Sequence, residues 1–322
     1  MRNVTAIIYD REGRPEEVCK AATIPLPEPQ ANEAVVEMRF VPINPADLNA
    51  IEGKYPTRPD QFPATPGVEG VGVVSSVGTE VTAVKTGDVV LLPHRVGTWR
   101  EAVVVPAQNL IPVPANVPLQ QAAMAKINPP TAWRMLHDFV DLQPGDWVYQ
   151  NVGNSGVGQA VIAICKAKGW RSCSVVRRPE SRDALLAMGA DVVLLEDEEL
   201  PREKPRLALN AVGGESALKL ANTLAHGGSL VTYGAMGRQP VKAPNGLLIF
   251  KDIAFRGFWV SAWYARSTPE QQREMFGALF PMIADGRIVG TVEHVYPLGE
   301  IKTALTRAAQ PSRNGKILLG MS

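Results

Sequence analysis

Strands and helices alternate from about residue 147 to residue 260, and this alternation limits the possible folds of the chain more than any other feature. The apolar runs that we predict as strands are Trp147–Val152, Ser174–Val176, Val192–Leu195, Leu207–Val212, Ser229–Tyr233 and Ile253–Val260. Helical segments or loops lie between them, such as Val157–Lys168, whose apolar residues recur at helical spacing. Because parallel strands need crossover connections, the pattern predicts a doubly wound parallel sheet of the α/β class.

A glycine-bearing turn joins the first of these strands to the helix that follows. Its glycine pattern is G-x-x-G-x-G rather than G-x-G-x-x-G, in the segment Gly153-Asn154-Ser155-Gly156-Val157-Gly158. Small residues let backbone N–H groups approach a pyrophosphate, and the N-terminus of a helix adds partial positive charge. We therefore predict that these six residues bind a dinucleotide cofactor. The alternative is a tight turn without a ligand.

The residues at the end of the second strand select between NADH and NADPH. Proteins that bind NAD commonly place an acidic residue about 20 residues beyond the glycines, where it binds the ribose 2′-hydroxyl. Here Arg177 and Arg178 follow the strand, and the nearest acidic residue is Glu180. Arginine makes charge-assisted, bidentate hydrogen bonds to phosphate. We predict NADPH, bound at its 2′-phosphate by both arginines; a pair of solvated surface arginines is the alternative.

The N-terminal 120 residues differ in composition, because they are rich in Pro and Gly. Short β-like runs occur at Ala34–Phe40, Gly70–Val77, Asp88–Leu92 and Ala102–Val105. Turn signals separate these runs, which predicts a compact β-rich domain of barrel type.

The segment after Val260 is too short to form a third domain. Thr268, Pro269 and Gln271 predict a helix N-terminus, and Pro281 should kink this helix or end it early. We expect the tail to return to the β-rich domain. The predicted domains are residues 1–122 with 263–322, and residues 123–262, with the active site in the cleft between them.

Composition and charge argue against several classes of function. The formal net charge is +1, which gives no electrostatic reason to expect a nucleic-acid or acidic-membrane partner. No apolar run reaches the roughly 18–20 residues that span a bilayer. The three cysteines and four histidines are scattered, so we predict no metal site. The first residues, Met1–Asp10, are typical of a strand rather than of a signal or transit peptide, and we expect a cytoplasmic protein.

Several motifs resemble the medium-chain dehydrogenase/reductase family. They are Ile43-Asn44-Pro45-Ala46-Asp47-Leu48-Asn49, Gly53-Lys54-Tyr55-Pro56, Pro66-Gly67-Val68-Glu69-Gly70-Val71-Gly72, Gly97-Thr98-Trp99 and Asn128-Pro129-Pro130-Thr131-Ala132-Trp133. The last motif, the turn at 154–157 and the segments 250–253 and 256–259 look like those of mitochondrial-type 2-enoyl thioester reductases. The resemblance covers essentially the whole chain. It implies a GroES-like catalytic domain, a Rossmann NADP-binding domain and a homodimer.

The resemblance also implies chemistry without zinc. Zinc-dependent members of the family carry an early Cys and a Gly-His-Glu segment, where this chain has Asn44 and Gly67-Val68-Glu69. Without a Lewis acid, nothing obvious stabilises the alkoxide of an alcohol oxidation, whereas reduction of an activated C=C bond needs less stabilisation of negative charge. We expect hydride transfer from NADPH to an electron-poor C=C bond, that of a 2-enoyl thioester. Two alternatives stay open: a quinone oxidoreductase or general enone reductase, and a non-catalytic NADPH-binding or structural protein.

Tyr55 is the candidate catalytic residue, because similar reductases place a Tyr in the same G-x-Y-P segment. A phenol can donate a hydrogen bond to a developing enolate or act as a general acid, and the sequence does not separate these roles. An aromatic wall of the cleft is the alternative.

The remaining site residues follow only from the resemblance. Asn128 and Thr131 would lie near the nicotinamide, and Lys316 would reach the cofactor from the C-terminal segment. Two strand ends would line the cofactor as well, and their residues are Tyr233, Gly234, Ala235, Met236, Phe258, Trp259 and Val260. The alternatives are a turn residue for Asn128, core aromatic side chains for Tyr233 and Trp259, and a solvated surface charge for Lys316.

Overall fold

The computed structural model describes residues 2–310 and 313–321, which form two compact units. The first unit contains the described residues up to 126, together with 267–284 and those from 290 onward. The second unit contains residues 127–266 and 285–289. Met1, with which the predicted N-terminal strand begins, lies outside the described residues.

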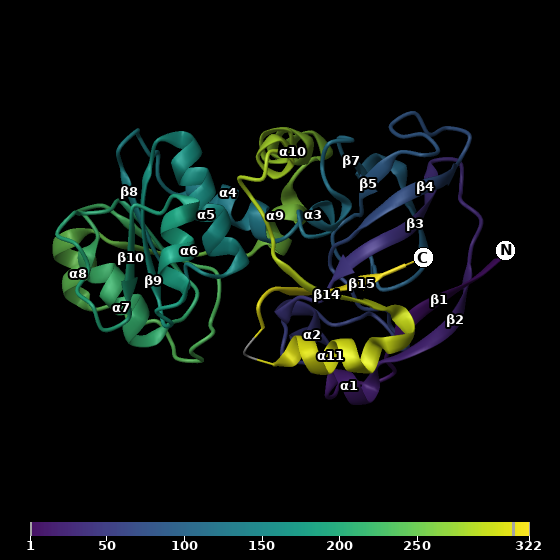
Figure 1. Ribbon diagram of the computed structural model, residues 1–322, viewed down its shortest axis with the longest axis horizontal. Helices are drawn as coiled ribbons and strands as arrows, with labels where there is room; N and C mark the ends of the chain where they lie inside the picture. The colour runs from purple at the N-terminus through teal and green to yellow at the C-terminus, as the bar shows by residue number, and fades with distance from the viewer. Residues whose placement is uncertain (1, 311–312, 322) are drawn as a thin grey trace. The chain divides into compact units, whose positions relative to one another are not determined.

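A six-stranded parallel sheet forms the centre of the second unit (Figure 1). Its strands lie in the order β10-β9-β8-β11-β12-β13, and every neighbouring pair is parallel. The strands are β8 (Trp147–Asn151), β9 (Arg171–Val176), β10 (Val192–Leu195), β11 (Leu207–Asn210), β12 (Ser229–Thr232) and β13 (Ala254–Gly257). The prediction of a doubly wound parallel sheet is therefore confirmed.

The strand order of this sheet reverses direction at β8, so right-handed crossovers place helices on both faces. The helices are α4 (Asn128–Asp138), α5 (Gly156–Lys168), α6 (Ser181–Met188), α7 (Gly214–Thr223), α8 (Asn245–Lys251) and α9 (Val260–Arg266). Figure 1 shows α5 and α6 on one side of the sheet and α7 and α8 on the other.

The last predicted strand, Ile253–Val260, is shorter in the structure. β13 ends at Gly257, and Val260 already begins α9. The sequence stays apolar beyond Gly257, at Phe258 and Trp259, and an apolar run alone does not show where a strand ends.

A larger, mainly antiparallel sheet organises the first unit. Its strand order is β14-β15-β3-β4-β5-β7, with β6 also paired to β3, while β1 and β2 form a separate antiparallel pair. The strands are β1 (Arg2–Ile8), β2 (Lys20–Leu26), β3 (Glu33–Pro42), β4 (Val71–Val77), β5 (Val89–Leu91), β6 (Ala102–Pro106), β7 (Ile111–Pro112), β14 (Val292–Pro297) and β15 (Lys316–Gly320). This β-rich architecture confirms the predicted fold class of the N-terminal region.

The helices of the first unit are short apart from α10. They are α1 (Pro15–Val18), α2 (Pro45–Ile51), α3 (Leu119–Ala123), α10 (Pro269–Ala284) and α11 (Ile301–Ala309), with 3₁₀ turns at Ala107–Asn109 and Leu298–Glu300. One buried core joins β1, β3, α11 and β15 through Ile7, Met38, Leu305 and Leu319. The C-terminal tail reaches this core because β15 pairs antiparallel with β3.

Helix α10 begins where the capping signal predicts. Thr268 and Gln271 exchange side-chain-to-backbone hydrogen bonds of 2.9 and 3.3 Å, as in a capping box. The helix then continues through Pro281, so the expectation that this proline ends it early is wrong. The lost hydrogen bond is offset by burial of the last turn, where Met282 and Ile283 lie in the core. None of the helices in the described residues combines the length and apolar character that crossing a bilayer requires.

Candidate active site

The turn between β8 and α5 has the geometry of a backbone anion site. Ser155 is the N-cap of α5, and its Oγ accepts a hydrogen bond from the backbone N–H of Gly158 at 3.0 Å. A Cβ at Gly158 would lie 2.5 Å from the carbonyl oxygen of Gly153, and a Cβ at Gly153 would lie 2.6 Å from the Cβ of Ser174. Both glycines are therefore required for the close packing of the helix N-terminus against the sheet.

Val152, the residue before this turn, has an unusual backbone conformation. Its φ is +53°, in the left-handed region that a β-branched residue adopts at a cost of about 1–3 kcal/mol. The carbonyl oxygen of Val152 accepts a hydrogen bond from the N–H of Ser155 at 2.8 Å, which closes the turn. Backbone strain is thus stored directly beside the glycines.

Two of the predicted residues lie against this turn. A Cβ at Gly156 would be 2.4 Å from Nδ2 of Asn128, so the Asn128 amide at the start of α4 lies over the turn. The hydroxyl of Tyr233 is buried beside Ser155, although it forms no hydrogen bond of normal geometry with a described residue. Burial raises the pKa of Tyr233 to about 12, so its phenol stays protonated. Asn128 and Tyr233 therefore present polar atoms at the turn.

The predicted Arg177 and Arg178 directly follow β9, and both side chains are exposed. Neither guanidinium forms an ion pair with any residue in the described ranges. Arg182 differs, because it forms an ion pair with Glu198. The two arginines that were predicted to bind phosphate are thus open to a ligand.

Most of the other predicted residues follow the ends of β12 and β13. They lie at the carboxyl edge of the parallel sheet, because the two strands are parallel neighbours. Met236 is 63% exposed and Trp259 37%, whereas Val260 is buried. Phe258 packs edge-on against Phe139, with 6.2 Å between ring centroids. Gly234 and Ala235 complete the loop after β12. At the start of α4, the Thr131 hydroxyl donates to the backbone carbonyl of Ile127 within its own helix.

Sequence reasoning missed a pair of asparagines at the carboxyl edge of the parallel sheet. Asn151 ends β8 and Asn210 ends β11, and both are buried. Asn151 donates to Asn210 at 2.9 Å, and Asn210 donates to Thr232 at 3.0 Å while accepting from the N–H of Gly213 at 3.0 Å. These hydrogen bonds fix the loops after three neighbouring strands. The signal in the sequence was an asparagine at the end of two strands that begin with apolar residues.

Tyr55 lies in the first unit, after α2, and is partly buried. The guanidinium carbon of Arg95 lies 5.7 Å from the centre of its ring, within cation–π range. Arg95 itself has a φ of +65°, so an uncommon backbone conformation directs this side chain. The sequence did not identify Arg95 as a partner of Tyr55.

A buried network of hydrogen bonds links Asn44, Glu69, Lys126 and Lys316. The Glu69 carboxylate accepts from Asn44 Nδ2 and from the backbone N–H of Lys126, each at 2.9 Å. Lys316 donates to Asn44 Oδ1 at 2.7 Å, and Lys126 Nζ donates to the carbonyl of Leu92 at 2.6 Å. Glu69 and Lys126 were missed as interacting residues, and Lys316, predicted at the cofactor, is part of this network. In the described ranges no three His, Cys, Asp or Glu side chains converge to hold a metal ion.

Burial shifts the titration of the charged groups in this network. It lowers the pKa of Lys126 to about 7, against the opposing effect of Glu69, and it also lowers the pKa of Lys316. It raises the pKa of Asp47, which lies in α2, to about 7. The network is therefore held by hydrogen bonds as much as by full charges.

Comparison with known proteins identifies the class. The alcohol dehydrogenase GroES-like domain family matches residues 30–115, and the zinc-binding dehydrogenase family matches residues 156–278. The fold and the site are those of a medium-chain dehydrogenase/reductase.

The individual relatives narrow the class to a family. The mitochondrial enoyl-[acyl-carrier-protein] reductase of Homo sapiens is 42% identical over 99% of this chain and 89% of its own length. The complex of Etr1p with NADP and crotonyl-CoA has a TM-score of 0.90 at 29% identity, covering both chains completely. The Etr1p/Etr2p heterodimer of the 2-enoyl thioester reductase from Candida tropicalis has a TM-score of 0.91 at 29% identity with the same coverage. This chain belongs to the enoyl reductase family, which confirms the resemblance stated above.

Another solved relative represents the alternative function. The Escherichia coli quinone oxidoreductase in complex with NADPH has a TM-score of 0.86 at 25% identity, covering 98% of this chain and all of the relative. The enoyl reductases are thus more similar in sequence than this quinone oxidoreductase.

The predicted cytoplasmic location is wrong by the same comparison. The similar enoyl reductases from Homo sapiens, Rattus norvegicus and Arabidopsis thaliana are all named mitochondrial. The prediction rested on the strand-like first residues. Arg2–Ile8 of that segment form β1, and a strand of a folded domain carries no information on where the protein is located.

Proposed function

We propose that this chain reduces the C=C bond of 2-enoyl thioesters with NADPH. The single observation that supports this most strongly is the 42% identity to an enoyl-[acyl-carrier-protein] reductase across 99% of the chain. The Etr1p complex with NADP and crotonyl-CoA supports the same cofactor and a thioester substrate.

The residues of the second unit fit a dinucleotide phosphate. A Cβ at Gly153, Gly156 or Gly158 would clash with neighbouring protein atoms, so the turn keeps the bare backbone at the α5 N-terminus that suits a diphosphate. The exposed guanidinium groups of Arg177 and Arg178 match a 2′-phosphate. We propose that Asn154, Ser155 and Val157 complete this site.

The roles of the other predicted residues follow from their places. Asn128 lies over the turn and Tyr233 is buried beside it, so we propose that both position the cofactor. We propose the same role for Thr131, Gly234, Ala235, Met236, Phe258, Trp259, Val260 and Lys316. The corresponding domains are a GroES-like catalytic domain of residues 1–122 and 263–322, and a Rossmann domain of residues 123–262.

When bound, NADPH supplies the hydride that adds to Cβ of the enoyl group. The carbonyl oxygen then gains negative charge, and a proton must reach Cα to give the saturated thioester. We propose that Tyr55 acts after hydride transfer. It either donates a hydrogen bond to the enolate oxygen or donates the proton to Cα. The Arg95 guanidinium over its ring adds positive charge close to the position of the phenol.

A substrate panel tests the proposal. NADPH oxidation is followed with crotonyl-CoA, benzoquinone and simple enones as acceptors, under identical conditions. We expect kcat/KM to be highest with crotonyl-CoA. A clear preference for benzoquinone would instead establish the quinone oxidoreductase that the Escherichia coli relative represents. Binding of NADPH without turnover of any acceptor would establish a non-catalytic protein.

We further propose a homodimer formed through the second unit. β13 is an edge strand of the parallel sheet, and α8, which leads into it, exposes Leu248, Ile249 and Phe250 at 43%, 69% and 78%. An open edge beside an apolar helix favours pairing with a second copy, and Etr1p and Etr2p form a heterodimer. Light scattering should give twice the chain mass for wild type and the single mass for Phe250→Glu.

A further inference from the structure

Tyr55 and Arg95 are brought together by two segments of the first unit that lie far apart in the sequence. Tyr55 follows the end of α2, where the N–H of Lys54 donates to the carbonyl of Asn49 at 2.8 Å. Arg95 belongs to residues 92–98, the Arg95 segment. The 5.7 Å between the guanidinium carbon and the centre of the Tyr55 ring therefore depends on how α2 and the Arg95 segment are held together.

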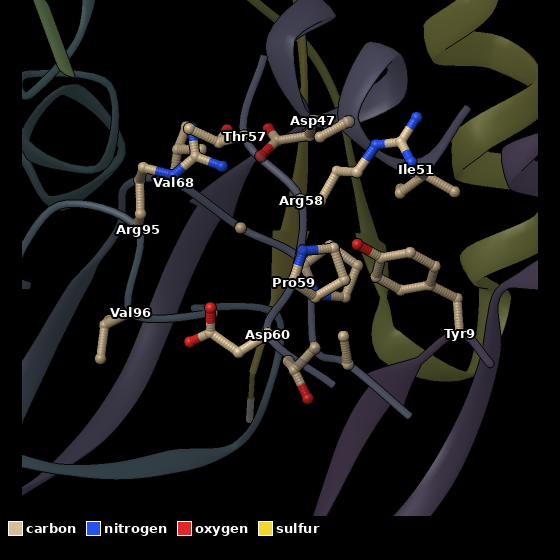
Figure 2. A pocket seen from close by; sticks show the side chains of 16 residues that line it. Tyr9, Asp47, Ile51, Thr57, Arg58, Pro59, Asp60, Val68, Arg95 and Val96 are labelled. Atoms are coloured by element: carbon tan, nitrogen blue, oxygen red, sulfur yellow. The ribbon is translucent and has the colours of Figure 1, made fainter. Parts of the chain in front are cut away.

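Direct packing fixes the spacing of α2 and the Arg95 segment only in part, because both line a cavity of about 320 Å³. Ala50 and Ile51 line it from α2, and Arg95, Val96 and Gly97 line it from the Arg95 segment. Figure 2 shows Arg95 and Val96 on one side of the cavity and Ile51 on the other. Protein interiors are normally close-packed, so a gap of this size leaves the spacing to be set by other contacts.

Glu69 connects the two segments through hydrogen bonds. Its side chain accepts from Asn44 Nδ2 at 2.9 Å, and Asn44 is the N-cap of α2. Its backbone carbonyl accepts from the Thr98 hydroxyl at 2.7 Å, in the Arg95 segment. The carbonyl of Val68, the preceding residue, accepts from the N–H of Arg95 at 3.1 Å. Glu69 is fully buried, so water does not compete for these hydrogen bonds.

Lys126 adds a second connection to the Arg95 segment. Its backbone N–H donates to the other oxygen of the Glu69 carboxylate at 2.9 Å, and its Nζ donates to the carbonyl of Leu92 at 2.6 Å. Lys126 is almost fully buried, which costs free energy that an apolar side chain of the same length would not. Glu69 is therefore connected to both ends of the Arg95 segment, to Thr98 directly and to Leu92 through Lys126.

We propose that Glu69 and Lys126 are positioning residues that hold the Arg95 guanidinium over the ring of Tyr55. Neither residue needs to contact the substrate, because each acts through the backbone segments that it anchors. An amine donates to a carbonyl whether or not it is charged, so this role does not require one protonation state of Lys126. The inference deepens the proposed function, since it rests on the role proposed there for Tyr55.

The position of the Tyr55 ring can be measured without turnover, by fluorine NMR of the full-length protein with 3-fluorotyrosine at its six tyrosines. Tyr55→Phe identifies the Tyr55 signal by removing it, and Arg95→Gln gives the position of this signal without the cation. Lys126→Met keeps a long apolar stem and removes the donor to Leu92. We expect Lys126→Met to move the Tyr55 signal by more than its line width, toward its position in Arg95→Gln.

Lys219→Met is the matched control. Lys219 Nζ also donates to a backbone carbonyl, that of Glu196 at 2.7 Å, but it lies in the second unit. This control should leave the Tyr55 signal within its line width. A signal that does not move in Lys126→Met, or that moves as far in Lys219→Met, would overturn the proposal. If Lys126→Met does not fold, Glu69→Gln takes its place, because it keeps the size of the side chain and removes one of its two acceptor oxygens.

A double-mutant cycle tests the effect on the reaction. Lys126→Met should lower kcat with crotonyl-CoA about tenfold in the wild-type background and less than about twofold in Tyr55→Phe, because a residue that acts through the hydroxyl has no effect once the hydroxyl is gone. KM for NADPH should stay within about twofold. Equal falls in both backgrounds would indicate a general loss of structure and contradict the proposal. If Tyr55→Phe alone leaves kcat unchanged, the proposed role of Tyr55 fails, and the fluorine spectra still decide whether Lys126 positions its ring.

Discussion

The two units contain functional sites built in opposite ways. In the second unit the turn at 153–158 presents backbone groups between β8 and α5. The side chains proposed to bind the cofactor phosphate there are two exposed arginines, Arg177 and Arg178, which follow β9. In the first unit, Glu69 and Asn44 are fully or nearly fully buried and depend on partners far away in the sequence. We conclude that a backbone site can be recognised from a local sequence pattern, whereas a buried polar network depends on partners that are distant in the sequence and requires every one of them.

The largest effect should follow from breaking the buried network. Glu69→Ala removes the acceptor of both Asn44 and the Lys126 backbone and leaves buried donors unpaired. We expect the free energy of unfolding to fall by about 3–5 kcal/mol. Urea denaturation measures it, with Glu198→Ala as the surface control, which should lower the free energy of unfolding far less because its ion pair with Arg182 is at the surface. Equal losses in the two variants would contradict the contrast between buried and exposed groups.

The pH dependence of stability should also report on the first unit. The pKa of Asp47 is near 3.9 in an unfolded chain and about 7 in the folded one, so the folded state retains the proton longer. The stability that this group contributes is present below about pH 4 and is lost as the pH rises to 7. Between pH 5 and pH 7 the loss is at most about 2.7 kcal/mol, from 1.36 kcal/mol per pH unit.

Asp47→Asn isolates this contribution, because asparagine keeps an oxygen that can accept from the Asn44 N–H. The stability of the variant should change less between pH 5 and pH 7 than that of wild type. Chemical denaturation at fixed pH values gives both curves. Parallel curves would show that Asp47 ionises in the folded protein as it does in water.

Tyr55→Phe tests the reactive side chain of the first unit. It keeps the ring under Arg95 and removes only the hydroxyl. We expect kcat with crotonyl-CoA to fall about 100-fold, within the usual range of a general acid, while KM for NADPH stays within about twofold. A fall in kcat of less than about threefold would remove Tyr55 from the reaction and leave it as a wall of the site.

The exposed arginines of the second unit should affect selectivity and not stability. Replacing Arg177 and Arg178 together by alanine should reduce the preference for NADPH over NADH about 10- to 100-fold, as two charge-assisted contacts are lost. The midpoint of thermal unfolding should stay nearly unchanged because both side chains are exposed. Ratios of kcat/KM for the two cofactors provide the measurement. An unchanged ratio would mean that the arginines are only solvated surface groups.

Sequence reasoning found the second unit because its signals are local. The first two strands of the parallel sheet, the glycines at 153–158 and the arginines at 177–178 all lie within about 30 residues of one another. It missed helix α2, although Asn44, Pro45 and Asp47 are an N-cap, a first-turn proline and a capping acid. It also missed the burial of Glu69, because its partner Lys126 is 57 residues away and no periodicity reveals such a pair.

The smallest effect should come from the strained residue at the edge of the backbone site. Val152 has a φ of +53°, which glycine adopts freely. Val152→Gly relieves strain of about 1–3 kcal/mol but adds about 0.5–1 kcal/mol of backbone entropy to be lost on folding. The difference is a net gain of about 0–2.5 kcal/mol in the free energy of unfolding, which urea denaturation measures. Val152→Ala should gain less, because alanine keeps the Cβ that disfavours this conformation. A loss of stability in Val152→Gly would mean that packing of the valine side chain outweighs the strain.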